Sequence, residues 1–241
     1  MLTIDVVIPV YNESENIKNT LDALSKSLMS LISQDVMFEV TVVFDFAEDT
    51  TVPVVRSLLH NYIFPIRLLQ NPIPGVLNAI KHGICSSCAD YALVTMADLS
   101  DDYRIIPMMV KHAQAGSDII CGSRYIKGGK QHGGPLLKKI LSRIAGLSIH
   151  FFSGVPTHDI TNSYKMYRVK PVKALHFEST GGFEIGMEIT AKIFRAGGKV
   201  TEIPTEWWDR SLGKSKFKLL AWLPKYLKWY FFLLLPNRST T

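Results

Sequence analysis

Two groups of acidic residues could hold a metal ion, because each follows directly on a short apolar run. Hard carboxylate oxygens gathered in a loop are the ligands with which Mg²⁺ or Mn²⁺ bridges a diphosphate. A metal ion so placed also neutralises charge on a leaving nucleotide. An acid that follows a strand is also a common helix cap or turn former, and this alternative stays open for each residue. The groups are Asp45, Glu48 and Asp49, and Asp98, Asp101 and Asp102, the second being the candidate set of metal ligands.

The apolar runs predict the elements that position these acids. The first run is rich in Val and Ile, as in strands buried on both faces. Asn12 and Glu15 predict a capping box at the start of the first helix. Strand–helix alternation predicts an α/β fold with a mainly parallel sheet and helices on both faces, where ligands bind at the carboxyl ends of the strands. The predicted strands span residues 4–10, 38–44, 66–69, 91–96 and 118–122, and the next helices span 51–60 and 75–86.

Common nucleotide and zinc motifs do not fit the chain. No GxGxxG follows the first predicted strand, where a dinucleotide-binding protein needs it. Residues 213–215, Gly-Lys-Ser, imitate the end of a P-loop, but Trp208 stands where that motif requires a glycine. Cys85 and Cys88 form one CxxC, and no second pair completes a zinc site. These observations exclude a Rossmann-type dinucleotide-binding protein, a P-loop NTPase and a zinc site built from two CxxC pairs.

Composition narrows the partners and the compartment. The 27 Lys and Arg residues against 21 Asp and Glu give a formal net charge of +6, which favours anionic partners. The basic residues form no nucleic-acid motif, so nucleic acid is not expected. An odd number of cysteines predicts a reducing compartment, and the amino-terminal residues do not resemble a signal peptide. Residues 229–236, the longest uncharged apolar stretch, fall short of the ~20 residues that span a bilayer, so we expect a cytoplasmic protein that is soluble or lies on a membrane surface.

Several short motifs follow one another along the chain. They are PVYNE at 9–13, the acid at 45, ADLS at 97–100, GSRY at 122–125, SR at 142–143, DITNSYKMYR at 159–168, ME at 187–188 and DRSLGKSK at 209–216. In this order they resemble the family 2 glycosyltransferases of GT-A fold, above all the dolichyl- and polyprenyl-phosphate sugar synthases. The resemblance extends over about residues 4–217. It implies a GT-A catalytic domain at residues 1–216.

The resemblance also implies roles for the acidic residues. Asp98 would be the retained acid of the family's Mg²⁺ or Mn²⁺ site, whereas Met96 stands where the synthases have another acid. Ser100, Asp101 or Asp102 could replace that ligand, and a metal-independent or inactive variant is the alternative. The residues expected to bind the nucleotide sugar or otherwise contact substrate are Pro9, Tyr11, Glu13, Asp45, Ser163, Lys165 and Glu188.

Basic residues beside the motifs fit the mechanism that the resemblance implies. A lipid phosphate is already anionic, so as a nucleophile it needs positioning and charge compensation more than a general base. Guanidinium and ammonium groups supply both. Arg124, Arg143 and Lys165 would face the acceptor phosphate, and Arg210 and Lys216 would close over the donor diphosphate. Glycine pairs at 128–129 and 133–134 permit a flexible loop, which the resemblance implies is a mobile acceptor loop, and the alternative is an ordinary turn.

The carboxyl-terminal segment, residues 217–241, predicts an amphipathic helix on a membrane surface. On a helix, Lys218, Lys225 and Lys228 fall within an arc of roughly 80° beside Tyr and Leu residues. Such a stripe suits a helix lying among lipid headgroups. The alternative is a helix packed on the domain itself or on a second subunit.

The resemblance, together with the placement of the basic residues, predicts a glycosyltransferase that moves a sugar from a nucleotide-sugar donor to a polyprenyl phosphate. The resemblance also implies that the reaction inverts the anomeric configuration. We expect it on the cytoplasmic face of a membrane, in peripheral contact with the lipid. Two alternatives remain at this point: a family 2 transferase with another glycan acceptor, and a non-catalytic module that binds nucleotide sugars or membranes.

Overall fold

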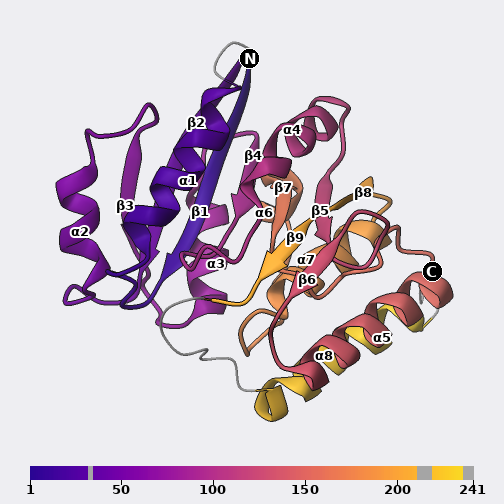
Figure 1. Ribbon diagram of the computed structural model, residues 1–241. Helices are drawn as coiled ribbons and strands as arrows, with labels where there is room; N and C mark the ends of the chain where they lie inside the picture. Colours follow the sequence, from indigo (N-terminus) through magenta and orange to yellow (C-terminus); the bar gives the residue numbers. More distant parts are fainter. Residues whose placement is uncertain (32–34, 211–218, 236–241) are drawn as a thin grey trace.

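A seven-stranded sheet forms the centre of the computed structural model, which describes residues 1–31, 35–210 and 219–235 (Figure 1). The strand order is β3-β2-β1-β4-β7-β5-β8. All neighbours are parallel except β7, which runs antiparallel to both β4 and β5. The predicted α/β class with a mainly parallel sheet is therefore confirmed. The strands are β1 Leu2–Val10, β2 Val36–Phe44, β3 Ile66–Gln70, β4 Tyr91–Val94, β5 Ile119–Ser123, β7 Lys165–Arg168 and β8 Val200–Pro204.

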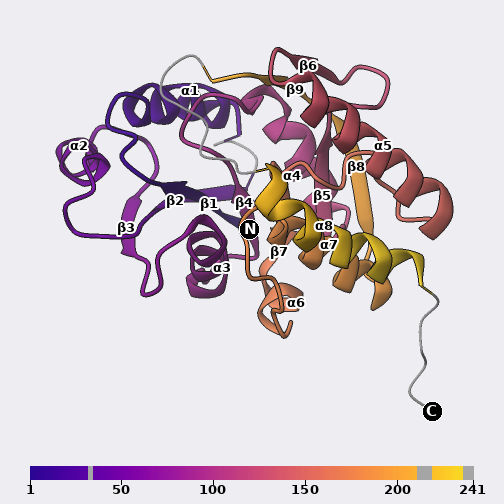
Figure 2. The same cartoon turned by 90° about the horizontal axis from the view of Figure 1, so that it is seen from below.

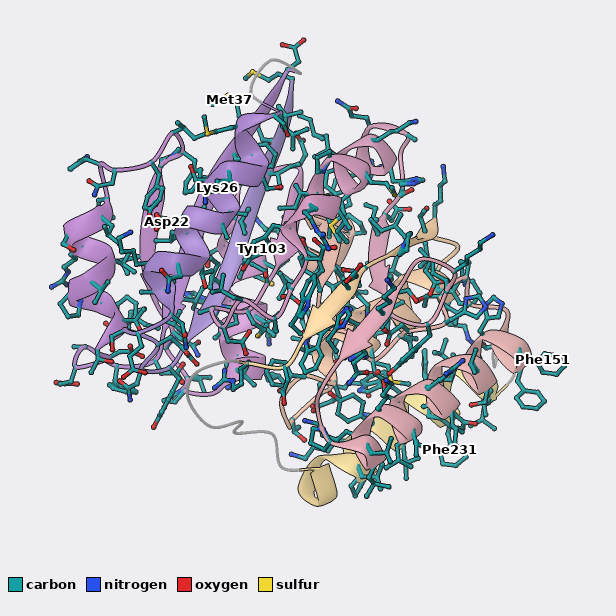
Figure 3. The ribbon with its side chains drawn as sticks, in the orientation of Figure 1. Asp22, Lys26, Met37, Tyr103, Phe151 and Phe231 are labelled. Atoms are coloured by element: carbon teal, nitrogen blue, oxygen red, sulfur yellow. The ribbon has the colours of Figure 1, made fainter. Side chains whose placement is uncertain are left out.

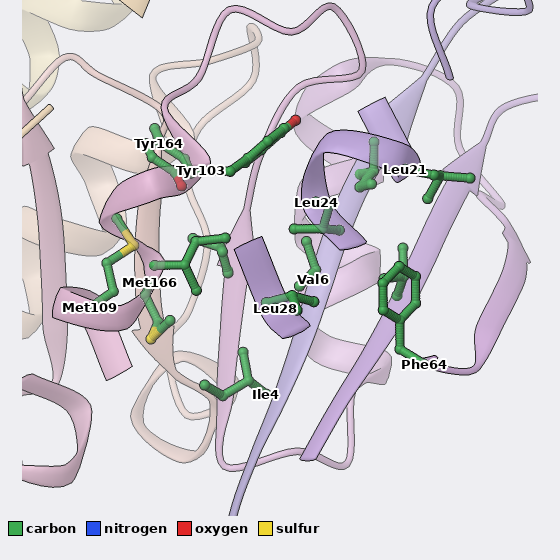
Figure 4. Packing of buried hydrophobic residues seen from close by; sticks show 14 of the residues in the cluster. Ile4, Val6, Leu21, Leu24, Leu28, Phe64, Tyr103, Met109, Tyr164 and Met166 are labelled. Atoms are coloured by element: carbon green, nitrogen blue, oxygen red, sulfur yellow. The ribbon is translucent and has the colours of Figure 1, made fainter. Parts of the chain in front are cut away.

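Helices cover both faces of this sheet (Figure 2). One face carries α1 Ile17–Met29, α2 Thr51–Leu58 and α4 Ile106–Gln114 with the short 3₁₀ helix η1 Tyr103–Ile105, and the other carries α3 Val76–Ser86, α6 Val169–Lys173 and α7 Ile185–Arg195. Each helix buries an apolar stripe at helical spacing, such as Leu21, Leu24 and Leu28 of α1 (Figure 4). Removal of these stripes from water is the main force that holds the layers together.

The first helix begins later than its sequence predicts. Helix α1 starts at Ile17, and Asn12 lies outside it with a φ of 56°. The Asn12 side chain instead accepts a hydrogen bond from the backbone N–H of Thr50 at 3.1 Å, and its own N–H donates to Asp49. The predicted capping box is therefore wrong. Asn12 ties the loop after β1 to the loop after β2, which brings the motif at 9–13 and the acid at 45 to one edge of the sheet.

Two further helices form a third layer at one side of the sheet. Helices α5 Leu136–Ser153 and α8 Leu219–Leu234 lie side by side (Figures 1 and 2). Trp229 and Leu233 of α8 are buried against Ile149 of α5 and Met187 of α7. The packing thus anchors α8 on the domain. None of the helices in the described ranges combines the length and apolarity needed to cross a bilayer.

A buried acid in β1 makes folding stability depend on pH. The Asp5 side chain is fully buried, and its Oδ1 atom has no hydrogen-bond partner among the described residues. Its Oδ2 lies 3.4 Å from Nη2 of Arg67. Burial, opposed by a hydrogen bond from Thr41, raises the pKa of Asp5 to about 6. The folded state therefore holds this proton more tightly than the unfolded chain does.

Replacement of Asp5 by Asn should stabilise the protein at neutral pH. The wild-type protein should lose on the order of 2 kcal/mol of stability as the pH rises from about 4 to about 6. Asp5→Asn should lack this loss, as measured by urea unfolding at pH 4, 5, 6 and 7. In Asp90→Asn, the matched control, stability at neutral pH should fall, because hydrogen bonds from Thr3 lower the pKa of Asp90. A parallel pH profile for wild type and Asp5→Asn would contradict the assignment.

Candidate active site

The loops after β1, β2 and β4 meet at one edge of the sheet. Strand β1 lies between β2 and β4, with Val10 opposite Phe44 and Val7 opposite Val94. Because the three strands are parallel, their carboxyl ends point the same way. Asp45 follows β2 and Asp98 lies in the loop after β4, so both acids lie at this edge, as their positions in the sequence predict.

One side of the edge combines a carboxylate with aromatic rings. Asp45 accepts hydrogen bonds from Nδ2 of Asn71 at 2.8 Å and from the backbone N–H of Gly75 at 2.9 Å. Tyr11 is exposed and meets the ring of Phe46 edge to face, with centroids 5.4 Å apart. A carboxylate held in place beside aromatic rings is suited to a planar group that donates hydrogen bonds. Pro9 lies half-buried near the end of β1.

The other side is organised by Arg210. Its Nη2 atom lies 2.9 Å from Oδ2 of Asp98 and 3.3 Å from Oε1 of Glu13, and its Nε lies 3.2 Å from the same Asp98 oxygen. Burial opposes the charge of Arg210, but the hydrogen bonds and charges of Asp98 and Glu13 raise its pKa. One guanidinium therefore joins the loop after β1 to the loop after β4.

Asp101 and Asp102 serve the structure of their own loop. Asp101 is buried and accepts hydrogen bonds from the hydroxyl of Thr95 at 2.8 Å and the N–H of Met96 at 3.1 Å. Burial and the nearby charge of Asp98 raise the pKa of Asp101 to about 7. Asp102 caps η1 and forms two hydrogen bonds to the guanidinium of Arg104, at 2.7 and 3.0 Å.

The predicted set of metal ligands, Asp98, Asp101 and Asp102, is therefore not assembled. Asp101 points into the core, Asp102 faces Arg104, and Asp98 faces Arg210. Within the described ranges, no group of three or more His, Cys, Asp or Glu side chains is gathered closely enough to hold a metal ion. Asp102 is a helix cap and Asp101 stabilises its own loop, so the alternative role of cap or turn former applies to these two acids.

A second site is a strongly basic cavity of about 480 Å³. It is lined by the segment after β5, by the short strand β6 Lys130–His132, and by the first half of α5. Fixed positive charges around an open cavity favour a phosphate or another compact anion. The charged or polar residues that line it include Arg124, Tyr125, Lys127, Lys130, Lys139 and Arg143.

Arg124 is held in this cavity wall by a buried carboxylate that sequence reasoning did not single out. Asp159 accepts hydrogen bonds from Nε of Arg124 at 2.7 Å, from Nη2 at 2.8 Å and from its backbone N–H at 3.0 Å. Ser142 of α5 accepts another from Nη2 at 3.2 Å. Although burial opposes its charge, Asp159 raises the pKa of Arg124. Asp159 opens the 159–168 motif, which was the available sequence indication.

Two of the predicted substrate-binding residues lie in the interior and away from the cavity. The Nζ of Lys165, in β7, donates to the carbonyl oxygens of Ile160 at 2.6 Å and Gly186 at 3.3 Å, and burial lowers its pKa. Glu188, in α7, accepts hydrogen bonds from the backbone N–H groups of Glu178 and Ser179. Both positions are corrected accordingly: they hold backbone segments together. Ser163 is half-buried just before β7, and Lys216 lies outside the described residues.

Strand β9 Glu206–Trp208 connects the two sites. It pairs in parallel with β6, whose residues were predicted to lie in a mobile loop or an ordinary turn. On its other side, the N–H of Trp208 donates to the carbonyl of Ser100 at 3.0 Å. The next residue, Asp209, donates its N–H to the carbonyl of His132 at 2.9 Å. The basic cavity, β9 and the Asp98 loop thus form one hydrogen-bonded unit that ends in Arg210.

Solved structures share this architecture. Glucosyl-3-phosphoglycerate synthase from Mycobacterium tuberculosis, in complex with UDP, superposes with a TM-score of 0.68 over 99% of this chain and 82% of that chain, at 14% identity. The same enzyme has been crystallised with Mn²⁺, UDP-glucose and phosphoglyceric acid, and with Mg²⁺ and UDP. This likeness shows that the fold is the α/β GT-A fold.

Comparison of sequences identifies the family. Residues 5–175 match glycosyl transferase family 2, and the chain belongs to this family. It is 29% identical over 240 residues to the dolichol-phosphate mannosyltransferase of Pyrococcus furiosus, covering 95% of this chain and 64% of that protein. It is 30% identical over 122 residues to the polyprenol monophosphomannose synthase of Mycolicibacterium smegmatis, covering 50% of this chain and 46% of that protein. The chain therefore spans less than two thirds of the length of either relative.

Removal of one partner from the ion pair between Arg124 and Asp159 should destabilise the folded state. The Asp159 side chain is fully buried and that of Arg124 is 12% exposed, so Asp159→Ala leaves a nearly buried guanidinium without its counter-charge. We expect a loss of about 3–5 kcal/mol in the free energy of unfolding by urea. Arg124→Met/Asp159→Leu, which removes both charges, should recover most of that loss. A loss below about 1 kcal/mol in Asp159→Ala, the level of an exposed pair, would contradict the assignment.

Proposed function

We propose that the chain is the catalytic part of an inverting glycosyltransferase that moves a sugar from a nucleotide donor to a polyprenyl phosphate at a membrane surface. The observation that carries the proposal is the connection, through β9, between the Asp98–Arg210 edge and the basic cavity. Membership of family 2 and the names of the two relatives support the same reaction class. Residues 1–216 form the proposed catalytic domain.

The donor nucleotide is proposed to lie across the ends of β1, β2 and β4. Asp45 offers a carboxylate to the N–H groups of a base, and Tyr11 offers an exposed ring. Arg210 faces the position of the diphosphate, where a guanidinium can bind two phosphate oxygens at once. Charge compensation there stabilises the nucleoside diphosphate as it leaves.

The acceptor phosphate is proposed to lie in the basic cavity. Arg124 is held rigidly by Asp159, and Arg143 is exposed on α5 where it lines the same cavity. A phosphate oxygen attacks the anomeric carbon as the bond to the diphosphate breaks, and the electron pair of that bond leaves with the diphosphate. Because the nucleophile is already an anion, no proton has to be removed. A single displacement of this kind inverts the anomeric configuration.

The apolar face of α5 and α8 is proposed to rest on a lipid surface. Leu136, Leu137 and Ile144 of α5 are 70%, 61% and 59% exposed, and Phe151 near its end is 80% exposed. Phe151 and Phe231 of α8 point away from the domain (Figure 3). This face begins at the amino-terminal turns of α5 that line the basic cavity, so a lipid tail could pass from the cavity directly into a bilayer. A lipid surface therefore matches both the positive charge of the cavity and the exposed apolar side chains of α5 and α8. The proposed location is the cytoplasmic face of the membrane.

The lysines of α8 make a different contribution from the one predicted. Lys225 donates to the carbonyl of Thr180 at 2.9 Å, and Lys228 lies 2.9 Å from a carboxylate oxygen of Glu178. Both therefore contact the domain itself, while Lys218 lies outside the described residues. In our proposal the exposed apolar side chains, mainly those of α5, contact the membrane.

Loss of the Arg143 charge should weaken the use of the acceptor selectively. In Arg143→Ala we expect kcat/KM for polyprenyl phosphate to fall about 10- to 100-fold, because a charge-assisted hydrogen bond contributes ~1.5–3 kcal/mol. The KM for the nucleotide sugar should stay unchanged, as measured by release of nucleoside diphosphate. Lys111→Ala, an exposed lysine of α4, is the control and should behave like wild type. Turnover with a soluble acceptor, together with none on polyprenyl phosphate, would contradict the proposed acceptor.

Membrane binding should depend on the exposed phenylalanines of α5. In Phe151→Ser/Phe152→Ser, binding to vesicles with anionic lipid should fall at least tenfold, because each buried ring contributes ~1.5–3 kcal/mol. Met29→Ser/Met37→Ser removes exposed apolar side chains elsewhere on the surface and serves as the matched control in flotation. Equal flotation of the two double variants would show that α5 is not the membrane contact.

A further inference from the structure

The sheet edge proposed to bind the donor nucleotide, at the ends of β1, β2 and β4, is called the donor edge. It offers few free carboxylate oxygens to a divalent metal ion. Oδ1 of Asp98 accepts the N–H of Ser100 at 3.2 Å, and Oδ2 accepts Arg210. Oε1 of Glu13 also accepts Arg210, and Oε2 accepts Nδ2 of Asn16 at 2.8 Å. Each carboxylate oxygen of this pair therefore already has a hydrogen-bond donor. The two acids are arranged to hold a guanidinium.

Met96, where the resembling synthases have a second acid, does not supply another hard ligand. Met96, two positions before Asp98, is half-buried and packs against the apolar cluster of α3 and α7. A thioether is a soft ligand, whereas Mg²⁺ and Mn²⁺ prefer carboxylate, carbonyl and water oxygens. Together with the inward orientation of Asp101 and the pairing of Asp102, this donor set does not fit the Mg²⁺ or Mn²⁺ site that the family resemblance predicts.

We propose that this chain binds the diphosphate of its donor without a divalent cation, and that Arg210 supplies the positive charge. The inference rests on the proposed function for the identity of the ligand. Asp98 and Glu13 orient Arg210, which is 19% exposed, toward the donor edge. A guanidinium stays charged at every physiological pH and matches phosphate oxygens in a bidentate manner. With five N–H donors, the guanidinium can keep its contacts with both carboxylates and also donate to oxygens of the diphosphate.

Calorimetry with nucleoside diphosphates tests the inference in the whole 241-residue chain. UDP, GDP, ADP, CDP and dTDP are titrated into the protein, once in excess EDTA and once with Mn²⁺. We expect at least one of them to bind, with dissociation constants in the two buffers that agree within threefold. Arg210→Gln should weaken binding in EDTA at least tenfold. Arg104→Gln is the matched control, because Arg104 pairs with Asp102 on the same loop, and it should bind like wild type.

A gain-of-function variant provides a second readout. Met96→Asp places a carboxylate two residues from Asp98, so Mn²⁺ should then tighten nucleotide binding at least tenfold. Electron paramagnetic resonance should detect Mn²⁺ bound by this variant with nucleotide, but none bound by wild type. Thermal unfolding checks that the variant is folded, and the Arg210→Gln titration keeps the test decisive if it is not.

Three outcomes would overturn the inference, and they separate its failure from that of the proposed function. Wild-type binding that appears only with Mn²⁺ contradicts the inference and leaves the proposed transferase intact. Equal affinity of wild type and Arg210→Gln in EDTA removes the assigned role of Arg210. Absence of binding for all five nucleotides in both buffers contradicts the proposed function, and the inference with it.

Discussion

The arrangement of the donor edge depends on one guanidinium that bridges two carboxylates. Arg210 contacts Glu13 after β1 and Asp98 after β4, although these residues are far apart in the sequence. Ion pairs this close to the surface contribute little to stability on average. Here the two partly buried carboxylates fix the direction in which the Arg210 guanidinium points. The contact orients Arg210 at the edge where the strands end, and it fixes the end of β9 there. The connection from β9 to the basic cavity follows from that placement.

A shared hydrogen-bonded unit gives the two proposed phosphate-binding sites a defined separation. Transfer between two anions requires that they approach each other in line while their repulsion is offset. At the basic cavity, the buried carboxylate of Asp159 holds Arg124. At the sheet edge, Glu13 and Asp98 hold Arg210. Asp159, Glu13 and Asp98 therefore act by positioning arginines. Asp45 and Asp101 instead accept hydrogen bonds that hold their loops.

Much of the fold could be predicted from the sequence, because apolar periodicity reports burial directly. The strands that precede Asp45 and Asp98 follow from short apolar runs, and parallel pairing with β1 places both acids at one edge. The directions of individual side chains could not be predicted, because they depend on contacts that form only in the tertiary structure. Asp101 turns inward to Thr95, and Lys165 is buried between two carbonyl oxygens. Strand β7 was missed as well, since its antiparallel pairing has no local pattern.

The most direct test of the account is the stereochemistry of the product formed by the purified chain. The chain is incubated with nucleotide sugars and polyprenyl phosphate, and the isolated lipid product is analysed by NMR at the anomeric position. The account predicts a glycosyl phosphate whose anomeric configuration is opposite to that of the donor, formed together with one nucleoside diphosphate for each sugar transferred. A product of retained configuration, or release of free sugar with no glycosylated lipid, would contradict it.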